Sequence, residues 1–312
     1  MKVSVYLLTY NHSSYIHQAI ESVLCQKNVE FELVIGDDYS TDGTREICKN
    51  YERRYPKCVR LLPNSEKLGM MRNAIRTLEA CKGEYIALLE GDDYWIDDYK
   101  LQEQVEFLEQ NKNYSLVFHR AKVLKEDVNQ ISLTDYYPVY KPKERTTLTD
   151  ILQENFMATS TVVFRNNLRG SVPAWFSRMP IGDWPLHILN AQYGDIAYLD
   201  RVMSVYRIHQ GGVWTNQMKT LEGELKAALQ ILEMYAVLDK EICLSSYNKK
   251  IIKNKQVDIL LRVAKLYSDL GRSDLSLRYL VSAWKKDMRR CVGKLKGTLS
   301  IIKSVAESIL KI

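Results

Sequence analysis

The chain has 312 residues, of which 46% are hydrophobic and 26% charged, as in ordinary globular proteins. This length allows one large domain, or one α/β domain with a smaller addition. No stretch approaches the roughly 18 uncharged apolar residues that a membrane span needs, which argues against an integral membrane protein. The net charge of +6 permits an anionic partner such as a nucleotide, a nucleic acid or a membrane surface.

The six cysteines are scattered and include no CxxC pair, which argues against a zinc site and against a disulfide framework. A reducing compartment fits this cysteine usage best. The first residues run directly into a strand pattern and show no cleavable signal. We therefore expect a cytoplasmic protein.

The first ninety residues alternate between strand and helix patterns with short connections. Strands are predicted for residues 3–8, 31–35, 59–62 and 85–89, and helices for 16–24, 44–51 and 72–80. Ser13 or Ser14 is the expected cap of the first helix. Such alternation predicts an α/β fold with a mainly parallel sheet that helices cover on both faces.

Beyond this region the pattern becomes less regular. A helix is predicted for residues 97–111, followed by strands at 115–119, 159–165, 196–199 and 203–206. The polar stretch 125–149 is interpreted as a long loop or excursion. After about Asn216 glycine and proline become rare, and residues 257–267 repeat apolar side chains at helical spacing. Gly271 interrupts this run and Ser273 can begin a partner helix, so a helical hairpin is expected.

Polar side chains follow the strands where they end: Asn11, Asp37, Asp38, Asn64 and the Glu90–Asp93 run. In parallel sheets, ligands bind outside the carboxyl ends of the strands. The carboxylates of Glu90–Asp93 repel one another at the end of an apolar strand, and a divalent cation is the common reason for such a cluster. The alternative is a solvated acidic turn.

Several ordered motifs match one known pattern. They are Thr9-Tyr10-Asn11, the Gly36–Thr44 segment, Asn64 with Gly69 and Arg72-Asn73, Gly83–Ile86 leading to Glu90–Trp95, Gly182-Asp183-Trp184 and Tyr206–His209. In this order the chain resembles the inverting family 2 glycosyltransferases with the GT-A fold, especially bacterial enzymes that build surface polysaccharides. The likeness covers roughly residues 2–214.

The resemblance implies a GT-A domain over residues 1–215, with a nucleotide-binding half (about 1–115) and an acceptor half (about 116–215). Residues 216–312 would form an α-helical C-terminal region. A dinucleotide oxidoreductase would instead need G-x-G-x-x-G after the first strand, where this chain has Thr9-Tyr10-Asn11-His12.

The resemblance also implies roles for residues on the nucleotide side. Thr9 and Tyr10 would line the base pocket, and Asn11 would shape the loop. Asp38 would accept a hydrogen bond from the base, because a carboxylate offers only acceptors. The same side of the site would include Asn64, Gly69 and Arg72, with Arg72 flanking the base or the diphosphate.

Glu90-Gly91-Asp92 occupies the D-x-D position of the family, with Glu90 in place of the usual first Asp. Asp92 and Asp93 would share the ribose and metal contacts, and His209 would add a contact to the metal or the diphosphate. Arg207 is a further donor-site candidate. Neutral imidazole suits manganese better than magnesium, so the expected cofactor is Mn²⁺ or Mg²⁺. The alternative for His209 is an ordinary loop histidine.

Asp183 aligns with the catalytic base of the family, although Gly182 precedes it where the family often has Glu. Asp183 could also be a helix N-cap ahead of Trp184-Pro185, and the two roles are compatible. The implied reaction is an inverting transfer of a hexosyl or N-acetylhexosaminyl group. The donor would be a nucleoside-diphosphate sugar, expected to be UDP-linked, and the acceptor a glycan or lipid-linked hydroxyl. The alternative is a non-catalytic nucleotide-sugar-binding or scaffold protein of the same fold.

The basic residues are spread out or cluster toward the C-terminus, and nucleic acid is not an expected partner. Lys285, Lys286, Arg289, Arg290, Lys294, Lys296 and Lys303 flank an apolar face made of Leu295, Leu299, Ile302 and Ile309. A basic amphipathic end can lie on an anionic membrane, here the cytoplasmic face of the inner membrane. The alternative is a helix packed on the domain with its basic face in solvent.

Overall fold

The computed structural model describes residues 2–127, 130–136, 142–168 and 172–293. Two compact units divide the chain: residues 1–178 with 182–209, and residues 179–181 with 210–312. The expected division into nucleotide and acceptor halves stays a prediction. Of the final segment that the sequence marks as basic and amphipathic, Lys294, Lys296, Lys303 and the four apolar residues lie outside the described residues.

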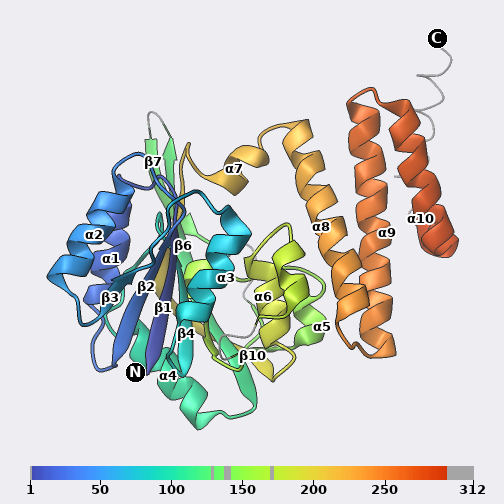
Figure 1. The fold of residues 1–312 in the computed structure, drawn as a ribbon. Coiled ribbons are helices and arrows are strands. Elements are labelled where there is room, and N and C mark those ends of the chain that lie inside the picture. The colour runs from blue at the N-terminus through green and yellow to red at the C-terminus, as the bar shows by residue number, and fades with distance from the viewer. Residues whose placement is uncertain (1, 128–129, 137–141, 169–171, 294–312) are drawn as a thin grey trace. The chain divides into compact units, whose positions relative to one another are not determined.

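The first unit opens with the expected alternation of strands and helices (Figure 1). Its elements are β1 (Val3–Thr9), α1 (Ile16–Leu24), β2 (Phe31–Asp37), α2 (Thr44–Arg54), β3 (Val59–Leu61), α3 (Met70–Ala80), β4 (Tyr85–Glu90), β5 (Tyr94–Trp95) and α4 (Lys100–Gln110). β1 pairs in parallel with β2 and with β4, and β2 pairs in parallel with β3. α1 has no side-chain cap and follows Tyr15, so the expected Ser13 or Ser14 cap is wrong.

The core of this sheet forms because alternate residues of each strand point to the same face. Val3, Val5 and Leu7 of β1 are fully buried in a cluster that also contains apolar residues of α1, α2 and α4. Helix α3 packs on β1 and β2. At Gly36 a side chain would meet the Thr77 hydroxyl at 2.0 Å, so the absence of one permits this close approach.

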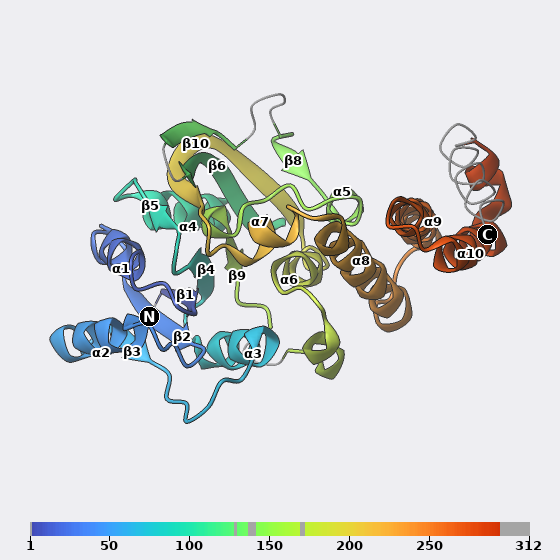
Figure 2. The same ribbon diagram turned by 90° about the horizontal axis from the view of Figure 1, so that it is seen from above.

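The second half of the unit completes a mixed sheet. Its elements are β6 (Tyr114–Asp127), β7 (Gln130–Asp135), β8 (Arg145–Thr146), α5 (Leu148–Ile151), β9 (Val163–Arg165), α6 (Asp183–Asn190) and β10 (Asp195–Ile208), with short 3-10 helices at Thr159–Thr161 and Ala174–Arg178. The strand order is β3-β2-β1-β4-β9-β6-β10-β5, with β7 beside β6 and β8 beside β10. β9 runs antiparallel to β4 and β6, whereas β6 and β10 are parallel. Figure 2 shows this arrangement from above.

Two expectations are corrected here. The segment 125–149 is not a loop throughout, because β7 forms an antiparallel hairpin with β6 and its alternating sequence suits a half-exposed strand. The separate strands at 196–199 and 203–206 are one strand, β10. Irregular pairing between Leu199 and Ser204 lets the exposed Asp200 and Arg201 interrupt the apolar pattern without ending the strand.

The second unit is helical. Its helices are α7 (Val213–Gln217), α8 (Leu221–Glu241), α9 (Ser246–Asp269) and α10 (Ser273–Gly293). α9 and α10 form the expected hairpin, and Gly271 between them has a φ of 72°, a value that glycine tolerates best. Among the described residues, no helix is long and apolar enough to cross a membrane.

Candidate active site

The strand register brings the predicted site residues to one edge of the sheet. Thr9 at the end of β1 lies opposite Asp37 of β2, and Leu8 lies opposite Glu90 of β4. The following loops therefore start side by side, although they are far apart in sequence. The Asp38 N–H donates to the Thr9 carbonyl at 3.0 Å and ties two of these loops together.

The side chains of the Glu90–Asp93 run have different environments. Burial raises the pKa of the Glu90 carboxyl well above its usual range, and the charges of Asp92, Asp93 and Asp183 add to this effect. Asp93 is 1% exposed and accepts a hydrogen bond from the Arg207 N–H at 2.8 Å. Burial, together with the charge of Asp92, raises the pKa of Asp93 well above its usual range too.

Asp92 contacts two histidines that come from distant parts of the chain. Its Oδ2 lies 3.0 Å from Nε2 of His209 and 3.8 Å from Nε2 of His12. Burial raises the pKa of Asp92, but the hydrogen bond to His209 and the charges of both histidines outweigh burial and hold it below the usual value. One ligand atom from each of the three residues lies within 4.8 Å of the others.

This cluster fits a divalent transition metal, because imidazole nitrogen and carboxylate oxygen are the donors that Mn²⁺ and its neighbours accept. The sequence predicts Asp92, Asp93 and His209 as the metal ligands. The structure brings Asp92 and His209 together, adds His12, and leaves Asp93 outside this group. His12 directly follows the Thr9-Tyr10-Asn11 motif, and that adjacency was the signal in the sequence that could have revealed it.

Arg207 holds the acidic turn in place. Its Nε donates to the Asp92 carbonyl at 2.9 Å, its Nη2 donates to Gln18 at 2.6 Å, and Nη1 pairs with Glu126. The guanidinium also lies 4.7 Å from the ring centre of Tyr15. Since Arg207 is only 7% exposed and its donors are engaged, it positions the turn and has little capacity left for a ligand.

On the nucleotide side, the Asp38 carboxylate fixes the loop before α3. It is 5% exposed and accepts hydrogen bonds from the backbone N–H groups of Leu68, at 2.7 Å, and of Gly69, at 3.1 Å. Gly69 has a φ of 84° and precedes the first residue of α3. The Asn64 amide donates to the Asp37 and Glu66 carbonyls at 3.1 Å each, so it too stabilises this loop.

The remaining nucleotide-side residues are more accessible or shape the first loop. Arg72 is exposed on α3, and Tyr10 is 38% exposed with the Lys67 ammonium 3.6 Å from its ring centre. Asn11 has a φ of 55° and accepts a hydrogen bond from the Thr41 N–H at 2.9 Å. Thr9 is buried, and its hydroxyl has no hydrogen-bond partner among the described residues.

Asp183 is the first residue of α6. Its Oδ2 accepts a hydrogen bond from the Asn155 amide at 2.9 Å, and its charge contributes to the raised pKa of Glu90. The helix cap is Gly182, and no side chain caps the helix, so Asp183 is not the N-cap. The carboxylate is partly exposed, which leaves it accessible to a substrate.

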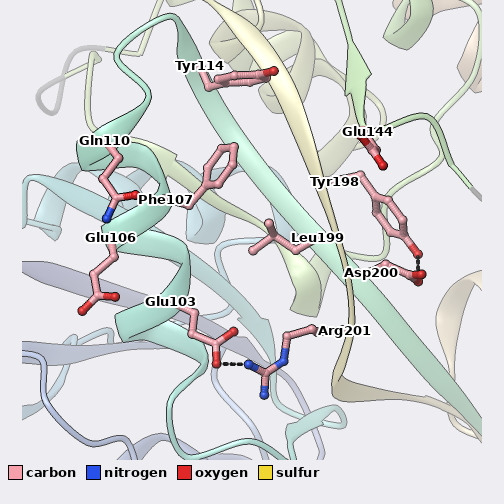
Figure 3. Close-up of a pocket in the computed structure, with 10 residues that line it drawn as sticks. All are labelled: Glu103, Glu106, Phe107, Gln110, Tyr114, Glu144, Tyr198, Leu199, Asp200 and Arg201. Carbon is pink, nitrogen blue, oxygen red and sulfur yellow. Dashed lines mark hydrogen bonds and ion pairs between the residues drawn. The ribbon is translucent and has the colours of Figure 1, made fainter.

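A cavity of about 520 Å³ lies elsewhere on the unit, between α4 and β10 (Figure 3). Its walls combine the aromatic rings of Phe107, Tyr114 and Tyr198 with four carboxylates and Arg201, which pairs with Glu103. None of the predicted site residues lines it. We therefore place the chemistry at the carboxyl edge of the sheet.

The mixed α/β sheet thus brings carboxylates and imidazoles together at the carboxyl edge of its strands. The sequence profile described as "Glycosyl transferase family 2" matches residues 4–168. The chain belongs to glycosyl transferase family 2, and the predicted family is confirmed.

The chain is also similar to individual bacterial proteins. An uncharacterized protein of Mycobacterium tuberculosis is 37% identical over 215 residues, which are 68% of this chain and 60% of that protein. The matched region thus spans about 60% of the length of that relative. The UDP-Glc:alpha-D-GlcNAc-diphosphoundecaprenol beta-1,3-glucosyltransferase WfaP of Escherichia coli is 26% identical over 228 residues, covering 70% of this chain and 82% of WfaP.

A solved structure confirms the predicted GT-A fold. The mannosyltransferase PcManGT from Pyrobaculum calidifontis, in complex with GDP-Man and Mn²⁺, matches with a TM-score of 0.62. The two chains are 15% identical, and the match covers 99% of this chain and 87% of PcManGT.

Proposed function

We propose that this protein transfers a sugar from a nucleoside diphosphate to a hydroxyl of a glycan or lipid-linked acceptor, with inversion and with the aid of a divalent metal ion. One observation carries the proposal. The charge of Asp92, in the His12–Asp92–His209 cluster, and the charge of the partly exposed Asp183 both raise the pKa of the Glu90 carboxyl. In this proposal the cluster holds the leaving group and Asp183 is the base.

In this proposal Asp183 is the general base. It removes the proton from the acceptor hydroxyl while the oxygen attacks the anomeric carbon on the face opposite the departing diphosphate. A single displacement inverts that carbon, and no covalent nucleophile is needed. The hydrogen bond from Asn155 to Oδ2 orients the carboxylate and leaves lone pairs for the proton.

His12, Asp92 and His209 would hold the metal ion, which when bound supplies Lewis-acid stabilisation of the charge that develops on the diphosphate. Arg207 would act indirectly, because its hydrogen bond to the Asp92 carbonyl keeps the Asp92 side chain aimed at the two imidazoles. Asp93 would anchor β10 through the Arg207 N–H rather than bind the metal.

Asp38 and Tyr10 would bind the nucleotide base. Oδ2 of Asp38 accepts one backbone N–H, from Gly69, and a second lone pair remains for a base N–H. Tyr10 offers a partly exposed ring for stacking, and Arg72 offers a planar donor without a partner among the described residues. We propose a UDP-linked hexose or N-acetylhexosamine as the donor, with support from the UDP-Glc in the name of WfaP.

A thermal-shift screen of UDP- and GDP-sugars with Mn²⁺ tests donor binding, because a ligand that binds only the folded state raises the melting temperature. Transfer is then tested with Asp183→Asn. We expect turnover to fall 10²–10⁴-fold while calorimetry finds the donor affinity within about threefold of the wild type. An equal loss of donor affinity would contradict the role of Asp183 as base. Donor binding by the wild type without hydrolysis or transfer to any acceptor would favour the non-catalytic alternative.

We also propose that α10 contacts an anionic membrane surface, which would suit a lipid-linked acceptor such as the one in the name of WfaP. Apolar side chains 37–64% exposed lie along α10, with Leu277, Val281 and Trp284 before a kink at Asp287 and Met288 and Val292 after it. Basic side chains of the same helix have no ion pair with a described residue: Arg278, Lys285, Lys286 and Arg289. Apolar and cationic groups together match the chemistry of an anionic lipid surface.

Cosedimentation of the full chain with vesicles tests this contact. We expect binding to phosphatidylglycerol vesicles, weak binding to phosphatidylcholine, and release by salt. Replacing Trp284 and Met288 by Ser should reduce binding at least tenfold. Leu133→Ser, which removes a 57% exposed side chain from β7, should leave it unchanged. Equal binding by all three proteins would contradict the proposal, and a dimer abolished by the double substitution would assign the surface to a second copy.

A further inference from the structure

The loop after β1 holds His12 in a fixed position beside the acidic turn. Its N–H donates to the Thr44 hydroxyl at 2.8 Å, and its carbonyl accepts the N–H groups of Tyr15, at 2.9 Å, and Ile16, at 2.8 Å. His12 is thus anchored to the start of α1 and to the start of α2. Hydrogen bonds at both its backbone N–H and its carbonyl therefore fix the position of His12 beside the acidic turn.

The two imidazoles approach Asp92 with the same atom. Nε2 of His209 lies 3.0 Å and Nε2 of His12 lies 3.8 Å from Oδ2 of Asp92. Donors on one octahedral cation at about 2.1 Å lie about 3.0 Å apart when adjacent and about 4.2 Å apart when opposite. The three donors, all within 4.8 Å of one another, therefore need little movement to share one cation.

The other ring nitrogen of His12 supports the same interpretation. Nδ1 is buried and has no hydrogen-bond partner among the described residues, and the same holds for the Thr9 hydroxyl. Both atoms border the space that a side chain at Gly91 would fill, at 2.9 and 2.6 Å from that position. A metal-bound imidazole usually donates its second N–H to an acceptor, and the Thr9 hydroxyl borders the same space as Nδ1 without forming that bond here.

We infer that His12 is a third metal ligand and that the resulting set of two imidazoles and one carboxylate selects Mn²⁺ over Mg²⁺. Magnesium prefers oxygen ligands and octahedral geometry, whereas imidazole nitrogen suits transition metals. The inference rests on the proposed metal-assisted function, but it concerns only the identity of the ligands and of the ion.

Titration calorimetry of the full chain with MnCl₂ and with MgCl₂, in the absence of donor and acceptor, tests this inference. We expect the wild type to bind Mn²⁺ at least tenfold more tightly than Mg²⁺. His12→Ala should weaken Mn²⁺ binding at least tenfold and change Mg²⁺ binding less than threefold. His12→Asp should shift the preference toward Mg²⁺, because it replaces a nitrogen donor by oxygen.

His17→Ala is the matched control, since His17 is an exposed histidine that contacts Tyr51 on the neighbouring helix. It should leave both affinities unchanged. Circular dichroism confirms that each variant is folded before its affinity is compared. Equal Mn²⁺ affinity of wild type and His12→Ala, or equal affinity of the wild type for both ions, overturns the inference. Neither result depends on transferase activity, so the inference and the proposed function fail separately.

Discussion

Gly91 lies at the centre of the acidic turn, where the structure leaves no room for a side chain. A Cβ at this position would lie 2.6 Å from the Thr9 hydroxyl, 2.8 Å from the Thr9 Cβ and 2.9 Å from Nδ1 of His12. All three distances are shorter than ordinary carbon contacts, and one of them involves an atom next to the backbone. Gly91→Ala must therefore displace β1 or the His12 ring.

The magnitude follows from the cost of inserting a methyl group into a packed interior, about 1–3 kcal/mol. For a domain of 150–250 residues each kcal/mol shifts the melting temperature by about 2–4 °C, so a drop of about 2–12 °C is expected. Movement of His12 should also weaken Mn²⁺ binding. Differential scanning fluorimetry without metal, followed by titration with Mn²⁺, measures both effects.

Gly182→Ala is the matched control, because a Cβ there meets only the Met71 sulfur at an ordinary 3.7 Å, and the φ of −101° suits alanine. It should change the melting temperature by no more than about 2 °C, as expected for a substitution within 0.5 kcal/mol. A Gly91→Ala protein that melts with the wild type and binds Mn²⁺ equally well would refute the reasoning about this turn.

Two further predictions concern buried groups. Arg207→Lys loses the forked contacts to Asp92, Gln18 and Glu126 and should destabilise the protein by about 1–3 kcal/mol in urea unfolding. On the same strand Arg201 is 55% exposed and forms ion pairs with Asp97 and Glu103, so Arg201→Lys should cost under about 1 kcal/mol. Equal effects of the two substitutions would contradict a special contribution of the Arg207 contacts. Burial lowers the pKa of His187 from 6.5 to about 4, although the charge of Asp183 opposes this shift. Between these pH values the unfolded chain binds more protons than the folded chain. The free energy of unfolding therefore falls as the pH drops from 6.5 to 4. The loss should reach about 3 kcal/mol, and His187→Leu should remove it; an unchanged pH dependence would contradict this account.

Much of the fold could be predicted because strand and helix periodicities differ clearly in the first ninety residues. β1, β2 and β4 are apolar runs buried on both faces, and the boundaries differ by one or two residues from those expected. β7 was missed because half-exposed strands have weak patterns, and the exposed, charged Asp200 and Arg201 concealed the continuity of β10. Pairing with β6 decides both cases, as the next strand along the chain for β7 and as a strand distant in sequence for β10.

The sequence could predict which loops meet at the carboxyl edge, but not the direction of each side chain. Asp92 and Asp93 are neighbours in sequence, yet one faces two imidazoles and the other faces the backbone of Arg207. Consecutive residues in a tight turn point apart, and the partners that distinguish them come from β10, from the residue that follows it and from the loop after β1. The position of His12 beside the Thr9-Tyr10-Asn11 motif could mark it as a candidate, but only the three-dimensional pairing places it with Asp92 and His209.

His12 follows β1 near the beginning of the first unit, and His209 follows β10 at its end, so the cluster joins positions that are far apart in the sequence. An ion shared by these two histidines would therefore act as a reversible cross-link that closes a loop of nearly the whole unit. Cross-links between distant positions restrict the unfolded chain most. Metal occupancy should consequently protect the amide protons of β1 and β10 from exchange together, coupling the ion content of the site to the cooperativity of the entire sheet.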